Sequence, residues 1–150
     1  MGQIAFLEKW GPEVVSSSRR ILVVEDDATL GQVIRFKLSR AGFDVIVAHN
    51  GSEALDLLGA SKFDLVVTDE IMPVMTGRQL CEQMQQNATL RRIPIVMLTV
   101  KALELDAAEL QSSLGVIEVH PKPFSPTLLL RTIERVLSRE AAECFETAAR

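Results

Sequence analysis

Polar side chains follow four apolar segments of this sequence, at the points where those segments end. In chain order they are Glu25, Asp26 and Asp27, then Asp69, then Thr99, and finally Lys122. An aspartate carboxylate can act as a nucleophile and form an aspartyl phosphate. A threonine hydroxyl can donate a hydrogen bond to a phosphoryl oxygen, and a lysine can pair with the same group as a point charge. These residue types together therefore indicate phosphoryl transfer.

Several carboxylates in one place also indicate a metal ion. Neighbouring carboxylates raise one another's pKa unless a cation lies between them. Mg²⁺ suits such a site, because it is commonly held by one or two protein carboxylates together with water and phosphate oxygens. Such an ion would neutralise charge on a transferring group. The sequence therefore predicts Mg²⁺ as the cofactor.

The elements that would position these residues alternate between strands and helices. Apolar, β-branched runs predict strands over 21–24, 43–48, 63–69, 93–100 and 116–120. Helical periodicity predicts helices over 30–41, 51–60, 76–88, 101–115 and 125–149. Ser52 and Ser125 are the expected N-caps of two of these helices, and Gly42 and Gly115 the expected C-terminal glycines of two others. Leu128, Leu129, Ile133, Val136 and Leu137 are the expected core residues of the last helix.

This alternation predicts an α/β fold with a five-stranded parallel sheet that is doubly wound, so that helices cover both faces. In such folds, sites form beyond the carboxyl ends of the strands. The polar residues after the strands are therefore expected to meet at one edge of the sheet.

Composition narrows the classes of function. The chain has 150 residues and a net charge of −4, which predicts one domain without the basic face that nucleic acid needs. No apolar run is long enough to span a bilayer, and the first residues do not resemble a signal peptide. Cys81 and Cys144 are far apart. We therefore expect a reduced, cytoplasmic protein, with Cys81 in the core and Cys144 as an exposed thiol.

Four segments of the sequence resemble the signatures of a known family. The segments "ILVVEDD", "FDLVVTDEIMPVMTG", "PIVMLTVKA" and "HPKPF" resemble, in order and spacing, those of the response-regulator receiver domain of two-component signalling. The resemblance implies the (βα)5 flavodoxin-like form of the predicted fold. It covers a receiver domain over 20–138, with an N-terminal extension over 1–19 and a C-terminal extension of the last helix over 139–150.

The resemblance implies a role for each matching residue in phosphoryl transfer. Asp69 would be the phospho-acceptor. Thr99 would hydrogen-bond the phosphoryl group and move on activation, and Lys122 would contact a phosphoryl oxygen. Pro123 would follow Lys122 through a cis peptide bond, a feature that is in general specified by the fold.

The resemblance also implies the metal ligands. Asp26 would bind Mg²⁺ directly, and Glu25 would act through water. Asp69 and the backbone carbonyl of Ile71 would complete the protein ligands. Asp27 is more simply a solvated or helix-capping acid.

Two residues depart from the family's common pattern. Val100 stands where a small residue is usual, and a β-branched side chain there could narrow the entry to Asp69. Val119 stands where an aromatic ring usually turns inward on activation. We therefore expect activation to rely on Thr99 and on helix movement, as a modest population shift.

The leading functional hypothesis is a stand-alone receiver similar to chemotaxis regulators, because the segment after Leu137 is too short for a DNA-binding domain. Its partners would be a sensor histidine kinase or a histidine phosphotransfer protein and a downstream protein target, with neither nucleic acid nor membrane. A homodimer stays open, since Phe6 and Trp10 could form a docking or dimer patch or a loosely packed arm. A receiver cut from a longer protein is the alternative within this class.

Two other classes remain. A degenerate receiver would act only as a binding module, without phosphorylation. An aspartate-nucleophile phosphatase of the haloacid-dehalogenase type needs a second aspartate two residues after the first, where this chain has Ile71. The preferred interpretation is therefore a phosphorylation-dependent regulator rather than an enzyme, although one able to catalyse its own phosphoryl transfer and dephosphorylation.

Overall fold

The structure is a computed structural model that describes residues 18–149, with side chains described through residue 139. The elements are β1 (Arg20–Val24), α2 (Ala28–Arg40), β2 (Asp44–Ala48), α3 (Gly51–Ala60), β3 (Leu65–Asp69), α4 (Gly77–Gln85), β4 (Ile95–Thr99), α5 (Ala107–Leu114), β5 (Val116–Pro121) and α6 (Pro126–Ala149). Two short 3₁₀ helices, η1 (Leu90–Arg92) and η2 (Ala102–Glu104), precede and follow β4.

The five strands form one sheet in the order β2-β1-β3-β4-β5, and all four pairings are parallel. The chain turns from β1 to β2 on one side and then crosses to β3 on the other. In doubly wound sheets, ligands bind at such a reversal of strand order, beyond the carboxyl ends of the strands. The predicted flavodoxin-like α/β fold is confirmed.

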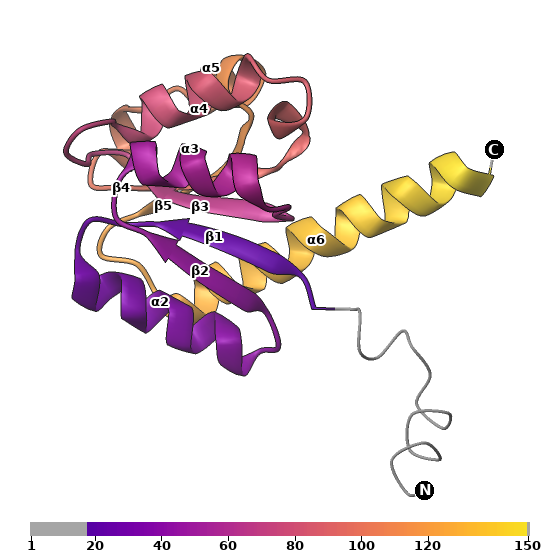
Figure 1. Ribbon diagram of the computed structural model, residues 1–150, viewed down its shortest axis with the longest axis horizontal. Coiled ribbons are helices and arrows are strands. Elements are labelled where there is room, and N and C mark those ends of the chain that lie inside the picture. The colour runs from indigo at the N-terminus through magenta and orange to yellow at the C-terminus, as the bar shows by residue number, and fades with distance from the viewer. Residues whose placement is uncertain (1–17, 150) are drawn as a thin grey trace, which may run out of the picture.

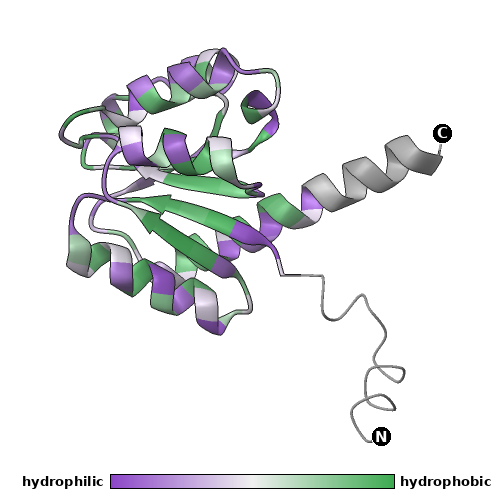
Figure 2. Ribbon diagram, viewed as in Figure 1, coloured by the Kyte–Doolittle hydropathy of each residue, from purple (hydrophilic) through white to green (hydrophobic). Residues whose placement is uncertain are grey.

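Two hydrophobic layers hold the helices against the sheet. Alternate residues of β1, such as Leu22 and Val24, join a core with α3, α4 and α5, whereas Ile21 and Val23 join a core with α2 and α6. Figure 1 shows these two groups of helices on opposite faces of the sheet. Figure 2 shows mostly hydrophobic strands between helices that mix hydrophilic and hydrophobic residues. Burial on both faces explains why the inner strands β1, β3 and β4 are continuous apolar runs, whereas the edge strands β2 and β5 are only partly buried.

Several expected element ends are confirmed. Gly115 ends α5 in the left-handed region with φ of 70°, and Gly42 follows α2 with φ of 100°. The Leu128 N–H donates to the Ser125 hydroxyl at 3.3 Å, so Ser125 caps α6. Asp27 caps α2, since its carboxylate accepts from the Leu30 N–H at 3.1 Å.

Ser52 does not cap α3, so that prediction is wrong. The cap is Asn50, whose side-chain oxygen accepts from the Glu53 N–H at 2.8 Å. Asparagine and serine are both good caps, and the backbone decides between them. Asn50 is extended, and Glu53 reaches back to accept from the His49 N–H at 3.0 Å.

The expected helix over 101–115 is two elements rather than one. The 3₁₀ helix η2 ends at Glu104, and α5 begins at Ala107. Asp106 separates them, because its side chain accepts from the N–H groups of Ala108 and Glu109 and holds its own backbone extended. Aspartate competes with helical hydrogen bonds in this way when it caps a following helix.

The expected core is confirmed with one exception in α6. Leu129, Ile133, Val136 and Leu137 are buried, but Leu128 is 53% exposed because it lies on the outer side of the first turn. Cys81 is buried as predicted, and burial raises the pKa of its thiol to about 12. The predictions for Phe6, Trp10 and the Cys144 side chain lie outside the described residues. In the described chain, no helix is both long and apolar enough to cross a bilayer.

Candidate functional site

Parallel pairing brings the polar strand ends to one edge of the sheet. The Glu25 N–H donates to the Ala48 carbonyl at 3.0 Å, which fixes the residue after β1 against β2. The Lys122 N–H donates to the Thr99 carbonyl at 2.9 Å, which fixes the residue after β5 against the end of β4. Asp69 is the last residue of β3, next to β1 and β4 in the sheet. Backbone hydrogen bonds of the sheet therefore fix the positions of the residues that carry these side chains.

Three carboxyl groups meet at this edge. Carboxylate oxygens of Glu25, Asp26 and Asp69 lie within 4.8 Å of one another. Glu25 and Asp69 are buried, with 1% and 6% of their surfaces exposed, whereas Asp26 is exposed. Three oxygen donors at this separation, one of them open to solvent, fit a hard divalent cation such as Mg²⁺.

Lys122 connects the two buried acids. Its ammonium donates to Asp69 Oδ2 at 2.8 Å and to Glu25 Oε1 at 3.3 Å. Burial alone lowers the pKa of Lys122, but the hydrogen bond and charge of Asp69 and then the charge of Glu25 outweigh burial, so the pKa lies above its usual value. Burial and the charge of Asp69 raise the pKa of Glu25 to about 7, although Lys122 opposes them. One ammonium thus offsets only part of the negative charge.

Thr99 lies at the same edge but its hydroxyl is engaged elsewhere. The hydroxyl is buried at the end of β4, where it donates to the Glu70 carboxylate and accepts from the Lys101 N–H at 3.0 Å. The sequence motifs predict no role for Glu70. The available signal was its place directly after the end of β3, because β3 is adjacent to β4.

The loop after β3 makes a close approach to helix α4. The Gly77 N–H donates to the Glu70 carbonyl at 2.7 Å, and a Cβ on Gly77 would lie 2.1 Å from the Asp69 carbonyl oxygen. Only glycine fits this contact. Thr76 and Gln79 then form a capping box that starts α4. The role of the Ile71 carbonyl as a metal ligand stays a prediction.

The residues that depart from the expected pattern lie at the margins of the site. Val100 is exposed, and Val119 is half-buried against the core shared with α3, α4 and α5.

His120 packs against α6, where its Nε2 lies 2.9 Å from the buried Thr132 hydroxyl and the two are hydrogen-bonded. The Lys122–Pro123 peptide bond is cis, as predicted.

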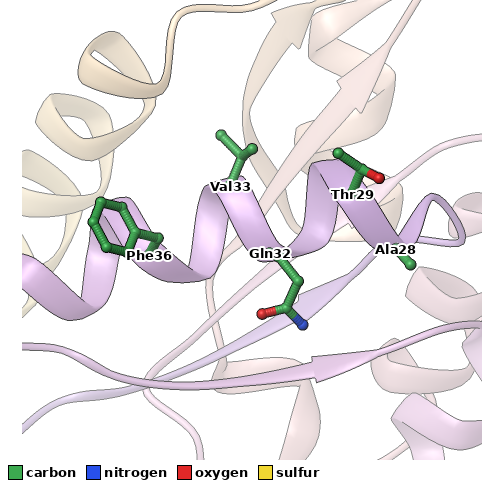
Figure 3. Close-up of a pocket in the computed structure, with 5 residues that line it drawn as sticks. All are labelled: Ala28, Thr29, Gln32, Val33 and Phe36. Atoms are coloured by element: carbon green, nitrogen blue, oxygen red, sulfur yellow. The ribbon is translucent and has the colours of Figure 1, made fainter.

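A shallow groove lies on α2, and none of the three carboxyl residues lines it. Its lining side chains all project from this one helix (Figure 3), and they are Ala28, Thr29, Gln32, Val33 and Phe36. A catalytic pocket normally combines an apolar wall with convergent polar groups. These five residues include no charged group.

Comparison with known proteins agrees with this fold. A family model described as the response regulator receiver domain matches residues 21–134. The chain therefore belongs to the family of receiver domains of two-component response regulators. Members of this family are regulatory modules that bind Mg²⁺ at an acidic pocket.

Three relatives illustrate the match. The alkaline phosphatase synthesis transcriptional regulatory protein PhoP of Bacillus subtilis is 36% identical over 122 residues, which are 81% of this chain and 50% of that protein. The chemotaxis response regulator CheY4 of Vibrio cholerae has a TM-score of 0.71 and 31% identity, covering 79% of this chain and 98% of that one. The receiver domain of sensor histidine kinase PA1611 from Pseudomonas aeruginosa, solved with a magnesium ion in the active site cleft, has a TM-score of 0.72 and 27% identity, covering 81% and 98%.

The chain spans about half of the length of the curated relatives it matches. Three of these curated relatives, PhoP among them, have names that describe transcriptional regulators, one of them as a probable regulator. The expectation that this chain binds no nucleic acid therefore stays a prediction. The limits of the three predicted segments, 1–19, 20–138 and 139–150, also stay predictions.

Proposed function

We propose that this chain accepts a phosphoryl group on Asp69 and signals through contacts with other proteins. One observation carries the proposal. The Asp69 carboxylate, at the carboxyl edge of the sheet, is bound by the Lys122 ammonium at 2.8 Å and lies within 4.8 Å of two further carboxylates. A nucleophile, a cation and a set of oxygen donors for a metal ion thereby occupy one place.

Asp69 is the nucleophile in this proposal. One of its oxygens attacks phosphorus and forms a new P–O bond, while the P–N bond of a donor phosphohistidine breaks and its electron pair returns to the imidazole. The phosphohistidine belongs to a sensor histidine kinase or a histidine phosphotransfer protein. Lys122 already touches Asp69, so a small movement brings its ammonium to a phosphoryl oxygen.

Asp26, Asp69 and the carbonyl of Ile71 would hold Mg²⁺ directly, and Glu25 would hold it through water. Bound there, Mg²⁺ would supply charge neutralisation for the transferring group. Glu25 remains bonded to Lys122, which keeps the ammonium positioned beside Asp69. The chain acts in the cytoplasm, as a regulator that catalyses its own phosphoryl transfer.

A mass measurement tests the acceptor. Incubation with Mg²⁺ and acetyl phosphate should add one phosphoryl group to the wild-type chain and none to Asp69→Asn. The matched control is Asp64→Asn, because Asp64 is an aspartate at the opposite end of β3, where it accepts from the Arg20 N–H at 2.7 Å. This control should be modified like the wild type.

Other outcomes favour the alternatives. A wild-type chain that gains no adduct would indicate a degenerate receiver that only binds partners. An adduct that survives in Asp69→Asn would refute the assignment of Asp69. Sustained turnover of phosphate esters would favour a phosphatase, for which the apolar Ile71 offers no proton donor.

A further inference from the structure

Thr99 has one hydroxyl proton, and the structure shows where it goes. The hydroxyl donates to the Glu70 carboxylate, while the Lys101 N–H donates to the same hydroxyl oxygen at 3.0 Å. A hydroxyl has a single donor, and the Lys101 N–H occupies one of its acceptor positions. The Thr99 proton therefore cannot serve Glu70 and a phosphoryl oxygen at once.

The backbone keeps Glu70 close to Thr99. Its N–H donates to the Leu98 carbonyl at 2.9 Å, and its carbonyl accepts from the Gly77 N–H at 2.7 Å. Glu70 is thus fixed on both sides, between the end of β4 and the start of α4. Its side chain can turn away, but its main chain holds it beside both Asp69 and Thr99.

A phosphoryl group on Asp69 would change the charge next to Glu70. Protein-bound phosphoryl groups carry about −1.5 to −2 charges at neutral pH, and like charges at short range oppose one another. Such a group is also a strong acceptor for the Thr99 hydroxyl. It would compete with Glu70 for the proton and repel its carboxylate.

We propose that Glu70 is a positioning residue, which holds the Thr99 hydroxyl in the unphosphorylated chain and is displaced by the phosphoryl group. The proposal rests on the proposed function. Glu70 would then compete with the phosphoryl group for the Thr99 hydroxyl. Binding of the phosphoryl group requires the Glu70–Thr99 hydrogen bond to break, which lowers the affinity of the site for that group.

Glu70→Gln tests the proposal by removing the charge while keeping the shape. Beryllium fluoride, with Mg²⁺ present, serves as the phosphoryl analogue, and its affinity is measured by NMR titration. Because hydrogen bonds to charged groups are stronger than neutral ones, Glu70→Gln should bind the analogue about tenfold more tightly than wild type. In the chain without analogue, the Lys101 amide signal should also move, since that amide donates to Thr99.

Two further variants separate this role from a general effect of charge. Glu104→Gln removes an exposed acid from the segment that follows β4 and should stay within about twofold of wild type. In a Thr99→Val background, Glu70→Gln should lose most of its gain, because the competition acts through the hydroxyl.

Equal affinities of Glu70→Gln and wild type would overturn the inference while leaving the proposed function intact. So would an undiminished gain in the Thr99→Val background, because Glu70 would then act only as a distant charge. A wild-type chain that does not bind the analogue would overturn the proposed function itself, and the inference with it.

Discussion

Glu25 is the most deeply buried acid of the site, and its ionisation is linked to the stability of the fold. Its pKa is raised to about 7, first by burial and then by the charge of Asp69. A carboxyl whose folded-state pKa lies above its unfolded value binds its proton more tightly in the folded state. Its contribution to stability is therefore full at low pH and is lost as the pH rises through about 7.

Glu25→Gln should remove this loss of folding stability at high pH. In the absence of divalent ions at pH 8, we expect the variant to have a free energy of unfolding on the order of 1–3 kcal/mol higher than wild type. At pH 5 the two proteins should differ much less. Urea unfolding at both pH values checks this, and a wild-type advantage at pH 8 would contradict it.

The sequence predicts both the types of residue at the site and their place in the fold. Glu25, Asp26, Asp69 and Lys122 meet because parallel strands end at one edge, which the alternation of apolar runs predicts. The direction in which a side chain points is harder to predict from the sequence. Glu70 turns toward Thr99 through a contact across 29 positions of the chain, and no local pattern encodes that.

At the scale of elements, the loop between β3 and α4 carries one strained residue. Val74 has a φ of 71°, in the left-handed region that β-branched side chains rarely adopt, and it is 83% exposed. Because the side chain is exposed, its packing does little to offset the backbone strain. The strain lies in the loop that also carries Ile71.

Val74→Gly should stabilise the fold. Glycine adopts positive φ without the steric cost, so thermal unfolding should show a gain of about 1 kcal/mol despite the greater freedom of the unfolded chain. The matched control is Val100→Gly, an exposed valine without positive φ, which should be neutral or destabilising. Equal effects of the two variants would contradict the assignment of strain.

The ends of elements were harder to predict than the elements themselves. All five strands follow from their apolar runs. Burial on both faces accounts for β1, β3 and β4, whereas β2 and β5 lie at the edges of the sheet and are only partly buried. The caps depend on competition between neighbours: Asn50 displaces Ser52, and Asp106 interrupts what periodicity alone makes one helix. Which of two suitable side chains caps a helix depends on the incoming backbone, and sequence periodicity does not contain that information.

The acidic cluster should couple metal binding to the folding of the domain. A ligand that binds only the folded state stabilises it by mass action, by about 2.7 kcal/mol at a hundred times its dissociation constant. For a domain of this size, saturating Mg²⁺ should raise Tm by about 5–10 °C. Differential scanning calorimetry with and without Mg²⁺ measures this shift.

The adjacent acids provide the control for that measurement. Asp26→Asn should abolish most of the rise in Tm, because it removes the exposed carboxylate of the cluster. Asp27→Asn should keep it, since Asp27 caps α2 and asparagine caps equally well. An equal loss of the Mg²⁺ effect in both variants would count against Asp26 as the ligand.

The Gly77 contact makes α4 a lever whose pivot lies beside Asp69, the last residue of β3. The first residue of the helix is bonded to the Glu70 carbonyl and touches the Asp69 carbonyl. Gln85, at the other end of α4, donates through its side-chain amide to the Leu114 carbonyl at 3.0 Å. At a rise of 1.5 Å per residue, a five-degree rotation about Gly77 would carry Gln85 through roughly 1 Å. A tilt of the Asp69–Glu70 peptide would thus be converted into displacement at the end of α5, on the far side of the core from α2 and α6.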